Sequence, residues 1–127
     1  MTDRSDIETL LRGFYAARLR GDVDAVCAAF ADDAKFEIAG AGQASPIAVI
    51  AVGSDEVRRW LALMIKTFRI ADHSILSMLI DGASAAVHWR ARVHSRVTGA
   101  AVLTEFVDLV RIEEGRIRSY TEFFVPR

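Results

Sequence analysis

The chain has 127 residues, of which 52% are hydrophobic and 26% charged, and its formal net charge is −1. This length is typical of one domain, spanning residues 1–127, with enough apolar residues to form a core without disulfides or a structural metal. A charge balance so close to neutral argues against a surface for nucleic acid or for an anionic membrane. Cys27 is the one cysteine, and no His/Cys cluster has zinc-ligand spacing, so we expect neither a disulfide nor a metal site.

The first residues are polar and mixed in charge, unlike those of a secretory signal peptide. The longest apolar stretch, residues 46–53, is too short to cross a bilayer. Both observations favour a location in the cytoplasm.

Two helices are expected first. Ser5 and Glu8 have the spacing of a capping box and predict the start of the first helix. Its apolar positions keep helical spacing: Ile7, Leu10, Leu11, Phe14 and Leu19. Gly21 is expected to end this helix and Asp22 to cap the second, which ends near residues 32–33. The apolar stripe of the second helix consists of Val23, Val26, Cys27 and Phe30.

Residues 35–38 alternate polar and apolar side chains and predict a short strand. Residues 39–53 are rich in Ala and Gly and predict a loop, although their apolar part, residues 47–52, is also consistent with an edge strand or a flap over a pocket. Ser54 is expected to cap a third helix. The apolar stripe of that helix is Val57, Trp60, Leu61, Met64, Ile65 and Phe68.

Four strands without an intervening helix complete the chain, at about residues 70–80, 85–97, 101–112 and 116–125. Residues with hairpin-turn chemistry separate them, at 81–82, 98–99 and 113–115. Helices followed by a run of strands predict an α+β fold, with the helices packed on one face of an antiparallel sheet.

Residues 21–34, residues 53–58 (Gly-Ser-Asp-Glu-Val-Arg) and residues 106–117, which end in Gly-Arg-Ile, form three motifs in order along the chain. They resemble the second helix, the start of the third helix and the last hairpin of the nuclear transport factor 2-like superfamily. The resemblance is to its SnoaL-like branch, which is related to polyketide cyclases and steroid delta-isomerases. It implies a cone-shaped α+β barrel, in which three N-terminal helices pack on a curved antiparallel sheet around one apolar pocket. It does not define an activity, because this fold hosts isomerases, cyclases, epoxide hydrolases, dehydratases and non-catalytic binders.

Strand alternation predicts which side chains face that pocket. In residues 87–95 one face carries Val87, Trp89, Ala91 and Val93. The opposite face carries His88, Arg90, Arg92 and His94. We expect the apolar set to lie inside and the charged set to face solvent or a partner subunit. In the next strand the pocket-facing set is Thr104, Phe106, Asp108 and Val110.

Asp108, Glu122 and Tyr120 are the candidate catalytic residues. A carboxyl group at position 108 has apolar neighbours, so it is paired with an arginine or a neighbouring strand, or solvated, or protonated with a raised pKa. The resemblance implies a functional role, because the steroid isomerase has an aspartic acid of its oxyanion hole at the place of Asp108. It also implies that Glu122 stands where the cyclases have a catalytic Asp. Together with Tyr120 these groups would suit acid/base work on a carbonyl or enol; otherwise both acids are structural.

Two further positions depart from the isomerase pattern. When the steroid isomerase pattern is aligned on Gly21 and Asp22, the isomerase's oxyanion-hole tyrosine falls on Phe14, one residue from Tyr15. The isomerase's general base falls on Ile38. Phe and Ile cannot move a proton, so steroid isomerisation by that mechanism is not expected. An epoxide hydrolase-like site needs an Asp-Arg-Asp relay around a water, and Arg90 and Arg92 have the wrong strand parity for it.

A mean hydropathy of +0.23 is high for a small protein and indicates a large core, a pocket or a subunit interface. The predicted ligand-binding residues are Phe14, Tyr15, Trp60, Met64, Trp89, Phe106 and Phe124. The aromatic residues predicted to be mostly buried are Phe14, Phe30, Trp60, Phe68, Trp89 and Phe106.

The sequence thus predicts a cofactor-free protein that binds a hydrophobic, cyclic, polyketide- or steroid-like molecule and forms a homodimer through the outer sheet face. The alternative is a non-catalytic ligand-binding or dimerisation module of the same fold.

Overall fold

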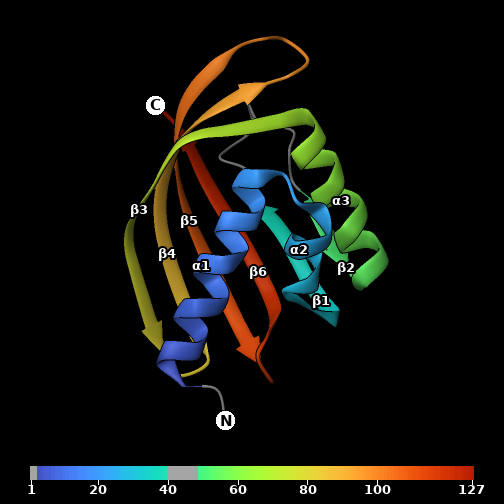
Figure 1. Cartoon of the computed structure of the whole chain (residues 1–127), viewed down its shortest axis with the longest axis vertical. Coiled ribbons are helices and arrows are strands. Elements are labelled where there is room, and N and C mark those ends of the chain that lie inside the picture. Colours follow the sequence, from blue (N-terminus) through green and yellow to red (C-terminus); the bar gives the residue numbers. More distant parts are fainter. Residues whose placement is uncertain (1–2, 40–48) are drawn as a thin grey trace.

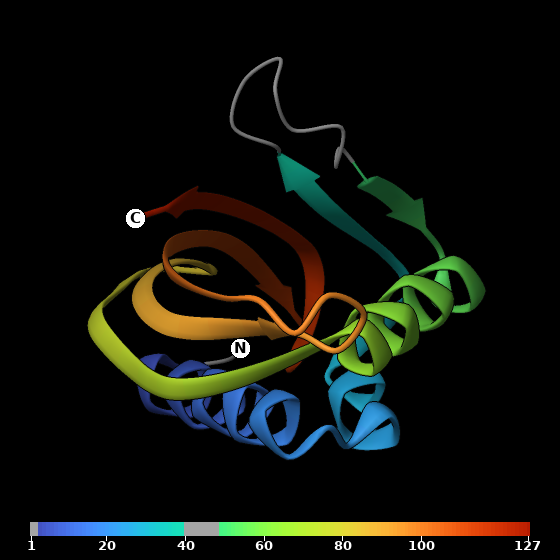
Figure 2. The ribbon, with the colours of Figure 1, turned by 90° about the horizontal axis from the view of Figure 1, so that it is seen from above.

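The computed structural model describes residues 3–39 and 49–127. Within them lie three helices, α1 (Arg4–Arg20), α2 (Val23–Ala28) and α3 (Ser54–Thr67). The six strands are β1 (Phe30–Ala39), β2 (Val49–Val52), β3 (Phe68–Asp81), β4 (Ser84–Ser95), β5 (Ala101–Glu113) and β6 (Arg116–Pro126). The helices pack on one face of the sheet (Figure 1), and the sheet bends around them when seen from above (Figure 2). The predicted α+β class is confirmed.

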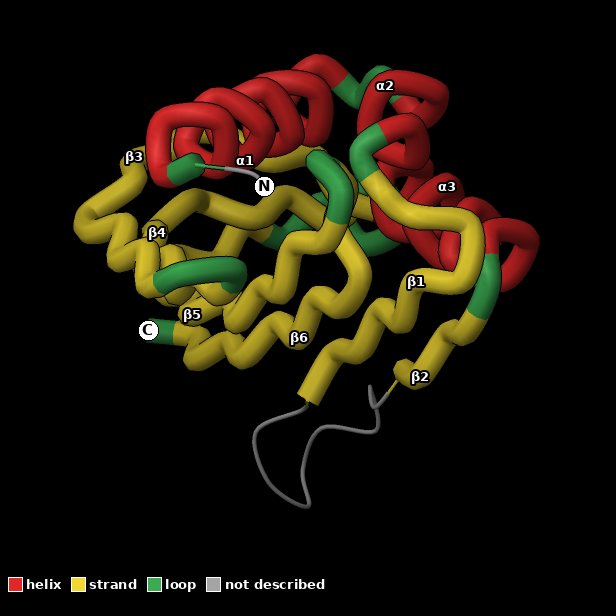
Figure 3. Tube along the Cα trace, turned by 90° about the horizontal axis from the view of Figure 1, so that it is seen from below, coloured by secondary structure: helices red, strands yellow, loops and turns green. Residues whose placement is uncertain are grey.

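The strands form one sheet in the order β2-β1-β6-β5-β4-β3. Neighbouring strands are antiparallel except β1 and β6, which are parallel, so the prediction of a purely antiparallel sheet is wrong at this pair. A tight hairpin forces its two strands to be antiparallel, but most of the chain separates β1 from β6 and leaves their relative direction free. In the described part of the chain β2 and β3 remain as edges, so the sheet is curved but does not close into a barrel (Figure 3).

The ends of α1 combine a correct prediction with a wrong one. The helix is capped by Asp3, whose side chain accepts a hydrogen bond of 2.9 Å from the backbone N–H of Asp6, and Ser5 lies inside the helix rather than at its cap. Gly21 ends the helix as predicted, in a left-handed conformation (φ 73°) that glycine adopts without steric cost. Asp22 then caps α2 by accepting a hydrogen bond from the backbone N–H of Ala25.

The second helix is shorter than its apolar spacing predicts. It ends at Ala28, and β1 begins at Phe30, which is paired with Ile117 of β6. Asp33 therefore lies on a strand, where its exposed carboxylate is 3.1 Å from the guanidinium of Arg118 on β6. The pairing with β6 thus overrides the helical periodicity, and the strand predicted at residues 35–38 starts five residues earlier.

The start of α3 also differs from prediction, since Gly53 is its N-cap and Ser54 its first residue. Of the apolar segment at 46–53, residues 49–52 form the edge strand β2, which pairs with β1. The rest of the predicted loop, residues 40–48, lies outside the described residues. No helix in the described ranges is both long enough and apolar enough to cross a membrane.

A hydrophobic core fills the space between the helices and the inner face of the sheet. Phe14, Phe30, Trp89 and Phe106 are buried as predicted, and Trp60 lies half-buried at the margin of the core. The prediction for Phe68 is wrong, because its side chain is 36% exposed. Phe68 is the residue at which the backbone changes from helical to extended, so it leaves the buried stripe of α3.

The predicted alternation of the strands is confirmed. Val87, Trp89 and Ala91 are fully buried on the inner face of β4, and Arg90 and Arg92 are exposed on its outer face. On β5 the inner residues Thr104, Phe106, Asp108 and Val110 are all buried. The same parity turns Tyr120 and Glu122 of β6 inward.

Candidate functional site

A cavity of about 560 Å³ lies between the C-terminal half of α3 and one end of the sheet. This volume is in the range of sites that enclose small molecules. Its wall is mainly apolar and includes Trp60, Met64, Ile70, Val93, Phe106 and Phe124. Among the described residues that line it, only Arg18 and Glu122 carry a charge.

Arg18 and Glu122 form a buried ion pair at this cavity. The two guanidinium nitrogens of Arg18 donate hydrogen bonds of 2.6 and 3.3 Å to the two carboxylate oxygens of Glu122. Their side chains are only 8% and 3% exposed. Burial by itself would lower the pKa of Arg18, but the charge and hydrogen bonds of Glu122, with smaller contributions from Tyr120 and Asp108, together raise it. The pair therefore presents two opposite, closely paired charges to a mainly apolar space.

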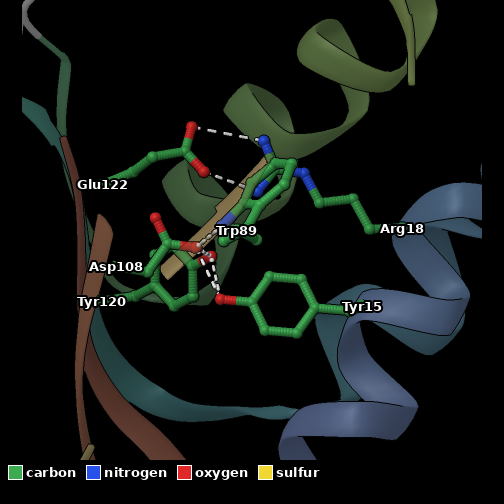
Figure 4. A network of polar contacts seen from close by, with 6 residues as sticks. All are labelled: Tyr15, Arg18, Trp89, Asp108, Tyr120 and Glu122. Atoms are coloured by element: carbon green, nitrogen blue, oxygen red, sulfur yellow. Dashed lines mark hydrogen bonds and ion pairs between the residues drawn. The ribbon is translucent and has the colours of Figure 1, made fainter. Parts of the chain in front are cut away.

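Asp108 lies next to this pair, opposite Glu122 across the β5–β6 ladder. One of its oxygens, Oδ2, accepts hydrogen bonds from the hydroxyl of Tyr15 at 2.6 Å, from the indole N–H of Trp89 at 2.6 Å and from the hydroxyl of Tyr120. Figure 4 shows these donors converging on Asp108, with the Arg18–Glu122 pair beside them. We call Asp108, Tyr15, Trp89 and Tyr120 the Asp108 cluster.

Burial dominates the electrostatics of the Asp108 cluster. Asp108 is fully buried, and the loss of hydration together with the nearby charge of Glu122 raises its pKa to about 8. The hydrogen bonds from both tyrosines favour the ionised form, but they do not offset the cost of burying the charge. Burial and the neighbouring Asp108 also raise the pKa of Tyr15 well above its ordinary value, and they do the same for Tyr120. At neutral pH the cluster is therefore a protonated carboxyl group surrounded by neutral donors.

The other oxygen of Asp108, Oδ1, is buried and has no hydrogen-bond partner among the described residues. In the protonated state this atom is the natural carrier of the proton, because Oδ2 already accepts from three donors. A carboxyl group of this kind can donate a hydrogen bond or a proton.

The structure divides the predicted site residues into two groups. Trp60, Met64, Phe106 and Phe124 line the cavity, as does Glu122. The remaining predicted residues are buried behind the wall, namely Phe14, Tyr15, Trp89, Asp108 and Tyr120. Trp89 stacks on Phe106 with a centroid distance of 3.7 Å, so it supports the wall from behind. The predicted proximity of the two carboxyl groups is present, while the catalytic roles stay predictions.

Arg18 is the site residue that the sequence interpretation missed. It follows Ile7, Leu11 and Phe14 on the buried stripe of α1, at helical spacing, whereas Leu19, which was assigned to that stripe, is 38% exposed. A charged residue on the apolar stripe of a helix was the available signal. The guanidinium also lies 5.3 Å from the ring of Trp89, where a cation is attracted to the face of the indole.

No three His, Cys, Asp or Glu residues gather as a metal site in the part of the chain that the structure describes. The family is decided by comparison with known proteins, because a model of the SnoaL-like domain matches residues 11–120. The chain belongs to the SnoaL-like family. This agrees with the three motifs at residues 21–34, 53–58 and 106–117. No curated protein sequence matches the chain.

Solved structures support the SnoaL-like fold. A protein from Bacillus subtilis, provisionally assigned as an isomerase, superposes with a TM-score of 0.85 at 17% identity, over 98% of this chain and 90% of that one. An LEH-like epoxide hydrolase from M. tuberculosis superposes with a TM-score of 0.77 at 19% identity, over 95% of this chain and 84% of that one. A provisionally assigned SnoaL-like polyketide cyclase from Mesorhizobium loti superposes with a TM-score of 0.69 at 20% identity, over 96% of this chain and 98% of that one. At these identities the likeness extends to the fold and not to the reaction.

Proposed function

We propose that the protein binds a hydrophobic, cyclic molecule in the cavity and performs cofactor-free proton transfer next to a carbonyl or enol group of that molecule. The observation that carries the proposal is the position of Arg18 and Glu122 as the charged pair lining an otherwise apolar cavity of about 560 Å³. A flat apolar body would pack between Trp60 on α3 and Phe106 and Phe124 on the sheet. Its polar group would then meet the ion pair.

The chemistry follows from what these groups can donate and accept. The Arg18 guanidinium has five N–H groups and uses two of them on Glu122; within the described residues the others donate no hydrogen bond, so they would be available to a substrate oxygen. Glu122 would remove a proton from the carbon next to the carbonyl, and Arg18 would stabilise the negative charge that develops on the oxygen. Returning the proton to a different carbon would isomerise the molecule. Attack of the same carbanion on a second carbonyl would close a ring.

Asp108 has a supporting role in this proposal. Its raised pKa keeps it protonated, so a second negative charge does not arise beside Glu122 while that group works as a base. Tyr120, predicted as a catalytic residue, donates its hydroxyl hydrogen to Asp108, so the proposal gives it no direct contact with the substrate.

A non-catalytic binding module is the second candidate. The observation that favours it is that both carboxylate oxygens of Glu122 already accept hydrogen bonds from Arg18, as expected of a structural ion pair. An epoxide hydrolase-like relay has less support. Arg18 could supply the arginine of such a relay. Among the described residues, however, Arg18 bonds to Glu122 and not to Asp108, which accepts from Tyr15, Trp89 and Tyr120.

We also propose a symmetric homodimer through the outer sheet face. Apolar side chains are exposed there on β3, β5 and β6, at Leu79 (67%), Leu109 (48%) and Phe123 (43%) respectively. Val107 lies between His88 and Phe123 in the register of the sheet, so apolar and ionisable groups share this face. An exposed apolar patch with a polar rim is typical of a subunit interface.

The test uses 2-tetralone, a bicyclic ketone whose α-hydrogens exchange slowly with D2O. We expect binding by calorimetry and faster exchange by NMR in the presence of the protein. Glu122→Gln should abolish the acceleration and retain binding. Binding without acceleration would favour the binding module, and no binding of this ketone, its alcohol or its parent hydrocarbon would contradict the proposal.

A matched pair of variants on β4 locates the binding. Val93→Phe adds a ring on the cavity side and should block binding. His94→Phe places the same ring one residue along the strand on the opposite face and should leave binding unchanged.

A further inference from the structure

The strand β3 contains a bulge that turns a histidine inward. Its register with β4 shifts between Ala71, which pairs with Arg92, and Ser74, which pairs with Arg90. Two residues of β3, Asp72 and His73, therefore lie opposite one residue of β4. Asp72 has φ 53°, a conformation that non-glycine residues rarely adopt, and its exposed side chain lies 3.7 Å from Arg92. Bulges commonly re-aim a side chain near a functional site. Here the side chain that faces the interior is His73.

His73 contacts two members of the Asp108 cluster. Its ring centroid is 5.2 Å from that of Trp89 and 5.8 Å from that of Tyr15. Both of these side chains donate hydrogen bonds of 2.6 Å to Asp108. The imidazole therefore packs against two donors whose positions determine how Asp108 is bound, although His73 itself does not contact Asp108 through any hydrogen bond recorded in the described residues.

The inner nitrogen of His73 adds a second observation. Nε2 is buried and has no hydrogen-bond partner among the residues that the structure describes, a property that it shares with Oδ1 of Asp108. An unpartnered buried polar atom is destabilising, and a phenylalanine would fill the same space without that cost. Two such atoms around Tyr15 and Trp89, together with a backbone outlier, indicate that this position serves the site rather than the stability of the core.

We infer that His73 is a positioning residue of the Asp108 cluster, whose neutral ring holds Tyr15 and Trp89 as donors to Asp108 and whose protonation loosens that arrangement. A proton on the ring would place a second cation near Arg18, whose partner Glu122 is already engaged by the Arg18 guanidinium. The cluster would then be intact only while His73 is neutral. This inference rests on the Asp108 cluster and requires no ligand, so it stands or falls separately from the proposed function.

The charges around His73 support the neutral state. Burial lowers the pKa of His73 below its ordinary value of 6.5, and the positive charge of Arg18 lowers it further. Tyr15 and Arg18 are the titratable groups that α1 brings to the ring. On β3 and β4 the neighbouring charges are Asp72, which pairs with Arg92, and Arg90, which is exposed on the outer face.

The indole N–H of Trp89 reports on the cluster directly, because it is bonded to Asp108. We expect its proton resonance to show two steps in a pH titration of the ligand-free protein. One has its midpoint below 6.5 and follows His73, and the other lies near 8 and follows Asp108. The indole resonance of Trp60, at the cavity wall, should lack the first step and serves as an internal control.

His73→Phe should remove the step below 6.5 and retain the step near 8, and the control His94→Phe should retain both. Persistence of the lower step in His73→Phe would overturn the inference. Should that variant not fold, the ring nitrogens of His73 in the wild-type protein can be titrated by NMR. A His73 pKa at or above 6.5, or one whose midpoint differs from that of the Trp89 step, would overturn the inference equally.

Discussion

Removing one partner of the Arg18–Glu122 pair should cost far more stability than removing both. The side chains are 8% and 3% exposed, so each single substitution leaves an uncompensated charge in the interior. For such a site the loss in free energy of unfolding is about 3–5 kcal/mol. Replacing both by apolar residues of similar size, as in Arg18→Met with Glu122→Met, is expected to change stability by about 1 kcal/mol or to increase it. The two substitutions should therefore be strongly non-additive.

Urea unfolding followed by tryptophan fluorescence gives the four free energies of this cycle. Since a domain of this kind has a total stability of about 5–15 kcal/mol, each single variant would lose a large share of it and shift the midpoint visibly. The exposed pair Arg58–Asp24, whose side chains are 52% and 87% exposed, serves as control and should show no measurable coupling. Single variants of Arg18 and Glu122 that are nearly as stable as wild type, with additive effects, would refute the assignment of a buried ion pair.

Three further predictions concern the core, the carboxyl group and the assembly. Phe30→Ala should cost about 3–5 kcal/mol in thermal unfolding, because Phe30 is buried against Phe14 and Tyr120; a loss under about 1 kcal/mol would contradict its place in the core. Because folding raises the pKa of Asp108 from 3.8 to about 8, the folded state binds more protons in this range, and the contribution of Asp108 to stability should be lost as pH rises through it. Asp108→Asn should remove that dependence from urea midpoints, and an unchanged slope would count against a buried, protonated Asp108. Sedimentation at micromolar concentration should show a mass of about twice 14.0 kDa, and a species of 14.0 kDa alone would exclude the homodimer.

The residues on the inner face of the sheet could be predicted from the sequence, because strand alternation is a local property. Side chains alternate between the two faces along each strand of the last hairpin. This alternation alone places Asp108 and Glu122 on the inner face, independently of the rest of the chain. The end of α1 could be predicted in the same way, because a glycine followed by an aspartate between two helices commonly ends the first helix and caps the second. These predictions needed no knowledge of distant contacts.

The predictions that were wrong or incomplete concern residues whose positions depend on contacts between distant parts of the chain. Phe30 keeps the spacing of α2, and only its pairing with Ile117 of β6 moves it into a strand. The helical spacing of Arg18 places it on the buried stripe of α1, but its partner cannot be identified until the position of Glu122 on β6, 104 residues along the chain, is known. Tyr15 was predicted to bind the ligand and not to contact Asp108, because the alignment put the isomerase tyrosine at position 14. In the structure Tyr15 donates to Asp108, and Phe14 packs in the core.

The central claim is that the cavity between α3 and the sheet holds an apolar molecule with its polar group at Arg18 and Glu122. Intermolecular NOEs from bound 2-tetralone test it most directly. We expect contacts from the ligand rings to the methyl groups of Met64, Ile70 and Val93, and a shift of the Arg18 guanidinium resonances on binding. Contacts to Val107 and Leu109 on the outer sheet face, with the Met64 and Val93 methyl groups unaffected, would contradict it.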